Sequence, residues 1–281
     1  MNYRHAYHAG NFADVLKHVV LVALIEHLAK KPSAMFLLDT HAGRGNYPLE
    51  AIETQRTGEY RAGIVPLLAA PSPPAPVAHY LEIVRRLGVL DGKLVSYPGS
   101  PLIALEALRP SDRAAFSELE PGEAATLKRG LGRDARAQVH ARDGYEALKA
   151  LTPPREKRGL VLIDPPYEDA EEFERLQGTL IAAHARWPGG VTAVWYPIKA
   201  GDAAGRFLDR MAASGIPSQL VVELGVQRDD LPGGLNGAGM LILNPPWQLD
   251  QYLAPALPWL RDRLAPERGR SRVSWHVKPP P

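Results

Sequence analysis

Cysteine is absent from this sequence. Disulfide bonds, thiolate zinc sites and a cysteine nucleophile are therefore excluded. The sequence also lacks any apolar run that approaches the roughly 18 residues of a membrane span, so we expect no membrane partner. The N-terminus carries histidine, arginine and aspartate instead of the apolar core of a signal peptide, which favours a cytoplasmic protein.

Strong net charge is absent as well, because the formal net charge is only +2 over 281 residues. A protein that holds nucleic acid by electrostatics alone would be more basic, so any nucleic-acid surface must be local. The hydrophobic content of 45% and the charged content of 23% suit an ordinary globular core. We expect a single domain over residues 1–281, with room for an insertion.

The stretch 159–168 is the most informative part of the chain. Its first half, 159–163, is a short apolar run that is typical of a strand buried on both faces of a parallel sheet. The run stops at Asp164, Pro165, Pro166 and Tyr167. In open α/β sheets, ligands bind outside the carboxyl ends of the strands. The sequence therefore predicts an acid, a rigid turn and an aromatic ring at the place where ligands bind.

These four residues suit an exocyclic amino group on a flat heterocycle. The prolines have no N–H to donate, so the Pro165 carbonyl and the Asp164 carboxylate remain as acceptors, while Tyr167 offers a stacking face. Two acceptors on a flipped adenine would favour a pyramidal amino nitrogen whose lone pair is free to attack. The same pattern is shared by amino-methyltransferases that act on nucleic acids. The alternative is a strand that ends in a proline turn, with Asp164 capping the next helix.

The remaining apolar runs predict a Rossmann-like α/β fold. In chain order, the expected strands are 34–38, 114–117, 138–141, 159–163, 191–197, 220–224 and 239–243. A short glycine-rich connection precedes the last strand, which makes that strand antiparallel to the one before it. The fold class is thus a seven-stranded mixed sheet with an antiparallel last strand. Residues 46–93 predict a small helical insertion after the first strand, either contacting substrate or only stabilising the fold.

Several residues near strand ends are candidates for holding a ligand. Asp39 to Gly45 form an acid and a glycine turn after the first strand, closer to the first loop of S-adenosylmethionine enzymes than to GxGxxG. Ser100 either caps a helix or holds a carboxylate. Glu118 and Glu120 compete to hold a ribose diol. Asp143 can accept from an adenine amino group, and the glycine after it lets the ring approach.

The N-terminal segment predicts a helix from Phe12 to about Lys30, with Asn11 as its N-cap. Four side chains there are potential metal ligands, namely His5, His8, His18 and Asp14. Their spacing matches no zinc motif, so we expect no metal site. Ordinary surface or capping histidines are the alternative.

A second proline turn, Asn244 to Trp247, fits the amino-methyltransferase pattern too. If the last strand is antiparallel, this turn lies at the opposite edge of the sheet from Asp164, and we interpret it as structural. The tail from Glu267 is basic and could touch RNA, although a frayed or edge-packed terminus is the more ordinary interpretation.

Taken in order, DVLKH, DTHAGRG, YPGSP, SELEP, ARDGYEAL, LIDPPYE, VWYP and GMLILNPPW make the chain resemble the RlmJ family, 23S ribosomal RNA adenine-N6 methyltransferases. The resemblance spans nearly the whole chain, and YRHAYHAGNFADVLKH is its most specific part. It implies a Rossmann-like class I methyltransferase fold with a helical insertion after the first strand. It also implies S-adenosyl-L-methionine as cofactor and naked 23S rRNA as the preferred substrate.

The resemblance implies roles for individual residues. Its cofactor-binding positions are His18, His41, Gly43, Ser100, Glu118, Asp143, Gly144 and Asp164. Its catalytic positions are Asp164, Pro165 and Tyr167, and its substrate-binding positions are Tyr3, Arg4 and Tyr167. It thereby favours Glu118 over Glu120 and makes His18 and His41 ligand contacts instead of metal candidates.

We therefore expect a monomeric, cytoplasmic RNA adenine-N6 methyltransferase that transfers the methyl group directly to a base flipped onto Asp164. Two alternatives remain open. A DNA adenine-N6 methyltransferase would share the proline turn, but it should carry a separate sequence-reading domain. A non-catalytic RNA-binding protein on the same scaffold would bind RNA without turnover.

Overall fold

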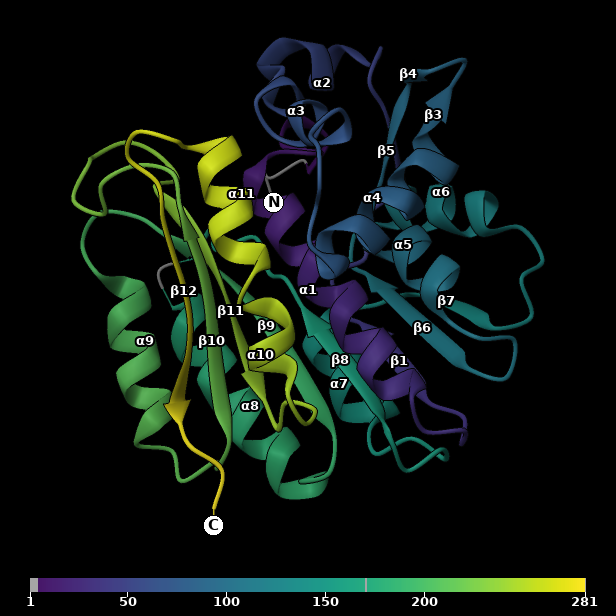
Figure 1. The fold of residues 1–281 in the computed structure, drawn as a ribbon. Coiled ribbons are helices and arrows are strands. Elements are labelled where there is room, and N and C mark those ends of the chain that lie inside the picture. Colours follow the sequence, from purple (N-terminus) through teal and green to yellow (C-terminus); the bar gives the residue numbers. More distant parts are fainter. Residues whose placement is uncertain (1–4, 170, 281) are drawn as a thin grey trace.

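An eight-stranded sheet forms the centre of the computed structural model, which describes residues 5–169 and 171–280 (Figure 1). In chain order its strands are β1 (Phe36–Asp39), β6 (Arg113–Glu118), β7 (Ala137–Ala141), β8 (Gly159–Ile163), β9 (Val191–Ile198), β10 (Gln219–Gly225), β11 (Gly237–Leu243) and β12 (Arg270–Val277). Their order in space is β12-β10-β11-β9-β8-β1-β6-β7.

The sheet is mostly parallel, as expected. Strands β7, β6, β1, β8 and β9 pair in parallel, whereas β11 is antiparallel to both β9 and β10 and lies between them. The antiparallel strand is therefore confirmed. The predicted count of seven strands is too low, because part of the basic tail, β12, pairs antiparallel with β10 and forms the sheet edge.

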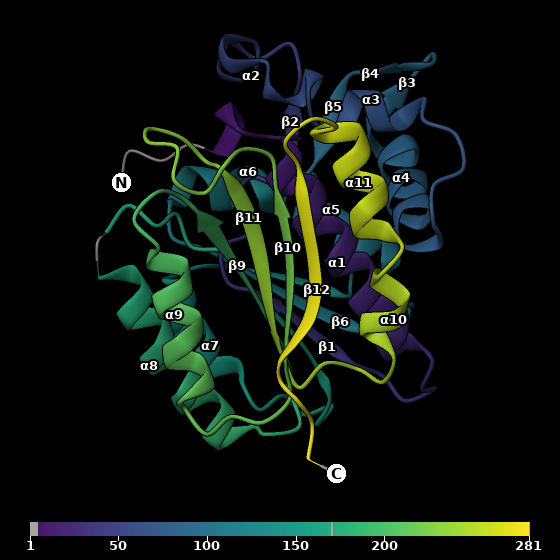
Figure 2. The same ribbon diagram turned by 60° about the vertical axis from the view of Figure 1, so that its left-hand side comes forward.

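Two helical layers cover the sheet (Figures 1 and 2). One face packs against α1 (Phe12–Ala29), α4 (Ala75–Gly88), α5 (Ser100–Ala107), α6 (Pro121–Leu131), α10 (Leu249–Leu253) and α11 (Ala256–Leu264). The other packs against α7 (Gly144–Leu151), α8 (Glu172–Arg186) and α9 (Ala203–Ala212). Alternate strand residues enter the two cores, as a sheet covered on both faces requires: Leu160 and Leu162 enter the first, and Val161 and Ile163 the second.

Helix α1 begins where the sequence predicts. The Asn11 side chain accepts hydrogen bonds from the amides of Ala13 and Asp14, so it caps the helix. Most of the helix is buried on all sides, because α4, α5 and α10 enclose it against the sheet. Two polar residues, Lys17 and His18, are buried with it. A buried lysine needs ionic partners, and those of Lys17 lie in the site described below.

The connection between β1 and β6 contains the residues predicted to form an insertion. After β1 come β2 (Asn46–Pro48), α2 (Ile52–Thr57), the short 3-10 helix η2 (Glu59–Arg61), α3 (Ile64–Leu68) and α4. The hairpin strands β3 (Val89–Leu90) and β4 (Lys93–Leu94) and the strand β5 (Ser96–Pro98) follow. Another short 3-10 helix, η1 (His5–Tyr7), precedes α1 and contacts α2.

The second proline turn lies far from the first. Leu243, the last residue of β11, pairs with Thr192 near the start of β9, whereas Asp164 follows the end of β8. Strands β8 and β9 are parallel, so the start of β9 and the end of β8 lie at opposite edges of the sheet. Asn244 therefore lies across the sheet from Asp164, as the antiparallel strand predicts.

Candidate active site

The carboxyl ends of β1, β6, β7 and β8 bring most of the predicted site residues to one edge of the sheet. Asp39 ends β1, Glu118 ends β6, and Asp143 and Asp164 follow β7 and β8. The parallel register aligns these ends: Asp39 pairs with Phe116 on one side and with Leu162 on the other. Residues far apart in sequence thus form a continuous row along the sheet edge.

Glu118 and the glycine turn meet directly. The Gly43 amide donates to Glu118 Oε2 over 2.8 Å, and the Glu120 amide donates to Oε1 over 2.9 Å. Burial raises the pKa of Glu118 above its ordinary value. Glu120 has a different task, because its side chain caps α6 by accepting from the Glu123 amide. Of the two glutamates, Glu118 is therefore the buried one at the sheet edge.

Ser100 contacts Asp39, the acid that ends β1, to which the family resemblance assigned no individual role. Its hydroxyl donates to Asp39 Oδ2 over 2.6 Å, and the His41 amide donates to Oδ1 over 3.2 Å. Burial raises the pKa of Asp39 to about 6. The expected role of Ser100 as N-cap is wrong, because Gly99 occupies the cap position and Ser100 is the first helical residue. The sequence signal for Asp39 was an acid at the end of a buried strand.

His41 and Asp143 lie on neighbouring loops. Burial lowers the pKa of His41 to about 4, so its imidazole is neutral at pH 7, and its Nδ1 lies 2.8 Å from the Thr40 hydroxyl. Asp143 caps α7 through Oδ1, and its Oδ2 accepts from Arg175 over 2.9 Å. Although burial opposes the change, the Glu146 amide and Arg175 hold the pKa of Asp143 below its ordinary value.

Gly144 is required by packing within the protein. A Cβ at this position would lie 2.2 Å from the Thr40 carbonyl oxygen, because the first turn of α7 rests on the residue after β1. We expected the missing side chain to admit a ligand ring. The structure adds an internal reason for this glycine, the close approach of two backbone segments, and the approach of a ligand ring stays a prediction.

His18 is fully buried beneath this edge. Its Nδ1 lies 2.7 Å from the Tyr97 hydroxyl, which in turn lies 2.9 Å from the Tyr80 hydroxyl. Burial and the charge of Lys17 lower the pKa of His18 well below its ordinary value, so the ring is neutral. Its Nε2 has no hydrogen-bond partner within residues 5–169 and 171–280. A buried nitrogen in this state is suited to a bound ligand.

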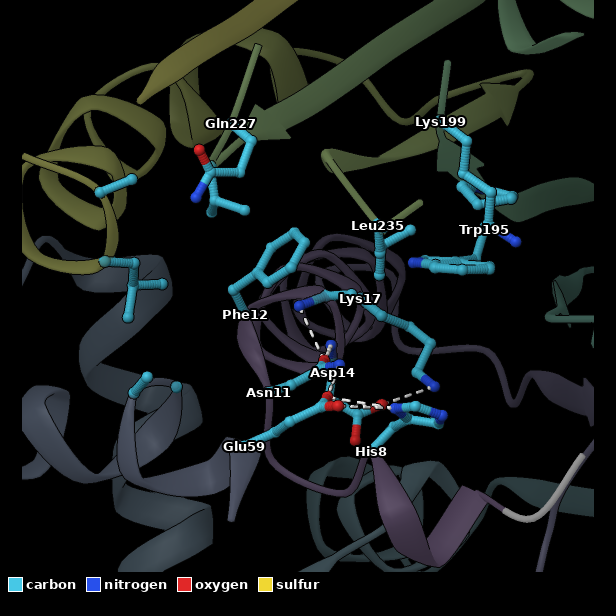
Figure 3. A pocket seen from close by; sticks show the side chains of 18 of the residues that line it. His8, Asn11, Phe12, Asp14, Lys17, Glu59, Trp195, Lys199, Gln227 and Leu235 are labelled. Carbon is cyan, nitrogen blue, oxygen red and sulfur yellow. Dashed lines mark hydrogen bonds and ion pairs between the residues drawn. The ribbon is translucent and has the colours of Figure 1, made fainter. Parts of the chain in front are cut away.

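A chain of ion pairs and hydrogen bonds links the N-terminal segment to Asp164. Lys17 Nζ lies 2.5 Å from Asp164 Oδ2 and 2.9 Å from Asp14 Oδ1, and His5 Nε2 lies 3.0 Å from Asp14 Oδ2. Figure 3 shows Asp14 and Lys17 among the side chains that line the cavity. Although burial opposes it, the two carboxylates raise the pKa of Lys17 well above its ordinary value. The predicted site did not include Lys17. Its sequence signal was a lysine inside a helix that is apolar on nearly every side.

The proline turn itself is held firmly. Tyr167 has a left-handed backbone with a φ of 51°, which is uncommon for a residue with a side chain. Its hydroxyl donates to the Trp195 carbonyl over 2.6 Å, and its ring packs against Phe173 and Trp195 with centroid distances of 4.7 and 5.8 Å. The aromatic ring is thus fixed beside Asp164 before any ligand binds.

A cavity of about 1090 Å³ opens beside this turn. Its walls come from the N-terminal segment and α1, from the segment 59–63, from the proline turn, from β9 and the residue after it, from the loop between β10 and β11, and from the turn between α11 and β12. Figure 3 shows several of these side chains, among them Glu59, Trp195 and Gln227. A volume of this order admits a nucleotide. The predicted substrate residues Tyr3 and Arg4 lie outside the described residues.

The described part of the chain contains no group of three or more His, Cys, Asp or Glu side chains arranged to hold a metal ion. Among the same residues, no helix is both long and apolar enough to cross a membrane. His5 and Asp14, considered above as metal ligands, instead belong to the chain of ion pairs and hydrogen bonds that ends at Asp164.

Comparison with known proteins gives long and consistent matches. The family model described as "Ribosomal RNA large subunit methyltransferase D, RlmJ" matches residues 32–277. Ribosomal RNA large subunit methyltransferase J of Escherichia coli is 40% identical over 278 residues, or 99% of each chain. The protein of the same name from Haemophilus influenzae is 39% identical over 276 residues, or 98% of each chain.

A solved structure agrees with these matches. The crystal structure of protein LPL1258 from Legionella pneumophila superposes with a TM-score of 0.88 at 33% identity, covering 95% of this chain and 98% of that one. The mostly parallel sheet, the row of acids along its carboxyl edge and the full-length similarity therefore lead to one conclusion. The chain belongs to the RlmJ family of ribosomal RNA large subunit methyltransferases, and it is a methyltransferase with a class I, Rossmann-like fold.

Proposed function

We propose that this enzyme transfers a methyl group from S-adenosyl-L-methionine to N6 of a specific adenine in 23S rRNA, acting on naked or partly assembled RNA. The observation that carries the proposal is the turn Asp164–Tyr167, which presents a carboxylate, a proline carbonyl and an aromatic ring to the large cavity. The two relatives are named for large-subunit ribosomal RNA, which supports this substrate class.

The residues along the sheet edge fit the proposed cofactor. Glu118 would hold the ribose diol, Asp143 would accept from the adenine amino group, and the turn around Gly43 would lie along the methionine part. Ser100 and His41 line the same edge through Asp39. The buried His18 Nε2, which has no partner among the described residues, is the observation that most favours a bound polar ligand. When bound, this cofactor supplies a methyl group on a positively charged sulfur.

Catalysis would rest on Asp164 and Pro165. The Asp164 carboxylate and the Pro165 carbonyl oxygen accept hydrogen bonds from the two amino hydrogens of the flipped adenine, which directs the nitrogen lone pair toward the methyl group. Lys17 anchors Asp164 Oδ2 by a charge-assisted hydrogen bond and so holds the side chain in place beside the reacting nitrogen. The target base would stack on Tyr167, with Trp195 as a second aromatic wall of the cavity.

Three further features belong to this proposal. The segment 46–93 would act as an inserted helical subdomain within the single domain 1–281, contributing Glu59 to the wall of the cavity. The protein would work as a cytoplasmic monomer. Tyr3 and Arg4 would contact the substrate RNA.

The test is methyl transfer from labelled S-adenosylmethionine, with protein-free 23S rRNA, assembled large subunits and duplex DNA offered in parallel. We expect N6-methyladenine on the free rRNA, with little label on assembled subunits and none on DNA. Preferred labelling of DNA would replace the RNA substrate with the DNA alternative. Bound cofactor without labelling of any substrate would favour the non-catalytic RNA-binding alternative.

A further inference from the structure

We use the name outer wall for the cavity-lining residues Glu168, Lys199, Gly233, Gly234, Glu267 and Arg268. Its two positive side chains, Lys199 and Arg268, have no ionic partner among the described residues. Lys199 follows β9 and Arg268 precedes β12, and both line the cavity that Asp164 lines. Both residues are exposed. Neither makes a hydrogen bond or an ion pair with another residue in the described ranges 5–169 and 171–280, in contrast to Lys17 on the inner wall.

The position of Lys199 directs its charge into the cavity. Figure 3 shows its side chain extending beside Trp195, on the same side of the cavity as that ring. The ion pair with Glu59 raises the pKa of His8, and the charge of Lys199 opposes this rise from across the cavity. Lys199 and His8 thus line the same cavity, with no ion pair between them.

The outer wall is not uniformly basic. Glu168 and Glu267 also line it, so the charges of the two cations are nearly balanced by two carboxylates. Attraction must therefore come from placing each cation against a discrete anion, and not from long-range steering. Of the two cations, Arg268 can contact a phosphate with two N–H donors, while Lys199 acts as a point charge.

A glycine pair on the same wall leaves room for a bulky ligand. Gly233 and Gly234 line the cavity, and a Cβ at either position would meet no protein atom within 4 Å. Gly233 has a φ of 88°, which accounts for glycine there. Neither backbone conformation nor internal packing accounts for Gly234. A side chain at this position would extend into the space beside the cavity.

We infer that Lys199 and Arg268 bind the two RNA phosphates that flank the target adenosine, and that the backbone at Gly233 and Gly234 allows the sugar-phosphate chain to pass. The inference rests on the proposed function. A base that rotates out of its strand into the cavity leaves its flanking phosphates at the cavity mouth, where these cations lie. The contacts are sequence-independent and hold the strand so that the base reaches Asp164.

The experiment compares Lys199→Gln, Arg268→Gln and the double variant with wild type. The matched control is the double variant Lys128→Gln and Arg133→Gln, which removes the same charge from exposed residues of α6 and the turn after it, near the opposite end of the sheet. RNA affinity is measured by anisotropy over a series of KCl concentrations, with a short single-stranded fragment of 23S rRNA around the modified adenine. Steady-state methyl transfer and cofactor affinity are measured on the same proteins.

Each phosphate contact on a single strand contributes about 0.7 to the slope of log affinity against log salt, which corresponds to about fivefold in affinity at 0.1 M salt. We therefore expect each single variant to weaken RNA binding about fivefold, and the double variant to weaken it about 25-fold and to lower the salt slope by about 1.4. KM for RNA should rise in parallel, while kcat stays within about twofold and cofactor affinity does not change.

Two results would overturn the inference. One is a double variant that behaves like the control in both affinity and salt slope. The other is a loss of kcat with unchanged RNA affinity, which would place these residues in the chemistry and not in phosphate binding. Wild-type protein that labels no RNA is a different failure, because it removes the proposed function itself.

Discussion

The chain contains two turns of the same pattern, and the sheet separates them. Asp164–Tyr167 follows β8 and opens on a cavity of about 1090 Å³, whereas Asn244–Trp247 follows the antiparallel β11 at the opposite edge. Each turn contains a left-handed residue, but at a different position: the fourth residue, Tyr167 with a φ of 51°, in the first turn, and the first residue, Asn244 with a φ of 53°, in the second. The two turns thus share a sequence pattern, but their local backbones and their surroundings differ.

The surroundings decide what each turn can do. Asp164 has a buried lysine as ionic partner, and Tyr167 is fixed by a hydrogen bond and by two aromatic neighbours. In the second turn, the Asn244 amide hydrogen-bonds to the Ser218 carbonyl, and the Trp247 side chain is 85% exposed. We therefore expect the direction of the preceding strand, and not the four-residue pattern alone, to decide which of the two turns can act in catalysis.

The largest expected effect is the loss of the acid at the first turn. Asp164→Ala should reduce methyl transfer to RNA by about 10³-fold or more, because it removes a preorganised acceptor at the reacting nitrogen. The matched change Asn244→Ala should alter the rate by less than about twofold. Both are measured with labelled S-adenosylmethionine, and cofactor binding by calorimetry checks that the fold is intact. Retained turnover in Asp164→Ala, or a comparable loss in Asn244→Ala, would contradict the difference between the turns.

The second prediction concerns the cation that only the first turn possesses. Lys17→Met keeps the aliphatic stem but leaves Asp164 and Asp14 without their shared positive partner. We expect methyl transfer to fall about 10²-fold and the free energy of unfolding to fall by about 3 kcal/mol, because breaking a buried ion pair leaves uncompensated charge. The measurements are single-turnover rates and urea unfolding.

A second substitution separates the two effects of Lys17. In Lys17→Met combined with Asp14→Asn, one of the uncompensated carboxylates is removed, so part of the stability should return while the rate stays low. Full recovery of the rate in this double variant would show that Lys17 acts only on stability and does not position Asp164.

The third prediction concerns the loss of folding stability that comes from ionising a buried acid, Asp39, at the carboxyl edge of the sheet, where the first turn lies. Burial raises the pKa of Asp39 from 3.8 to about 6. Between these values the folded chain holds a proton that the unfolded chain has lost, so the free energy of unfolding falls as pH rises through this window. The shift corresponds to about 3 kcal/mol, which is fully present as a cost at pH 7.

Asp39→Asn tests this cost. The asparagine can still accept from Ser100 but has no proton to lose, so relative to wild type it should gain about 3 kcal/mol of stability between pH 4 and pH 7. Guanidinium unfolding at several pH values measures the difference between the two proteins. Parallel pH profiles would contradict the assignment. Asn244→Asp at the opposite, exposed turn should show a far smaller pH-dependent difference from wild type.

Those strands of the fold that are continuous apolar runs could be predicted from the sequence. The buried strands β1, β8 and β11 have continuous apolar patterns and were predicted close to their observed positions. Strand β12 was not predicted, because it alternates charged and partly exposed residues. It is held by pairing with β10 and by contacts such as Arg272 with Glu223. Such an edge strand becomes visible only when its partner is known.

In the candidate site, too, some residues were predictable from sequence and others were not. Acids at strand ends were predictable, since parallel topology brings those ends together. The Lys17–Asp164 pair was not, because 147 residues separate its members and no local pattern links them. The reason for Gly144 was also missed, because a close approach to the Thr40 carbonyl depends on how α7 packs on β1. Sequence thus indicated the residue types at the edge, and tertiary packing determined their partners.

The smallest expected effect concerns the aromatic residue of each turn. Tyr167→Phe removes the hydroxyl that donates to the Trp195 carbonyl over 2.6 Å but keeps the ring and its packing. We expect a loss of about 1 kcal/mol in stability and a decrease of about threefold in kcat, because the ring remains available for stacking. Tyr167→Ala should lower both kcat and stability considerably more, since it removes the stacking surface itself.

Trp247→Ala is the matched change in the second turn. It should change neither rate nor stability measurably, because the indole is largely solvated already. Thermal unfolding and steady-state transfer on all three variants provide the comparison. Equal losses in Tyr167→Phe and Tyr167→Ala would mean that the hydroxyl, and not the ring, is what the first turn contributes.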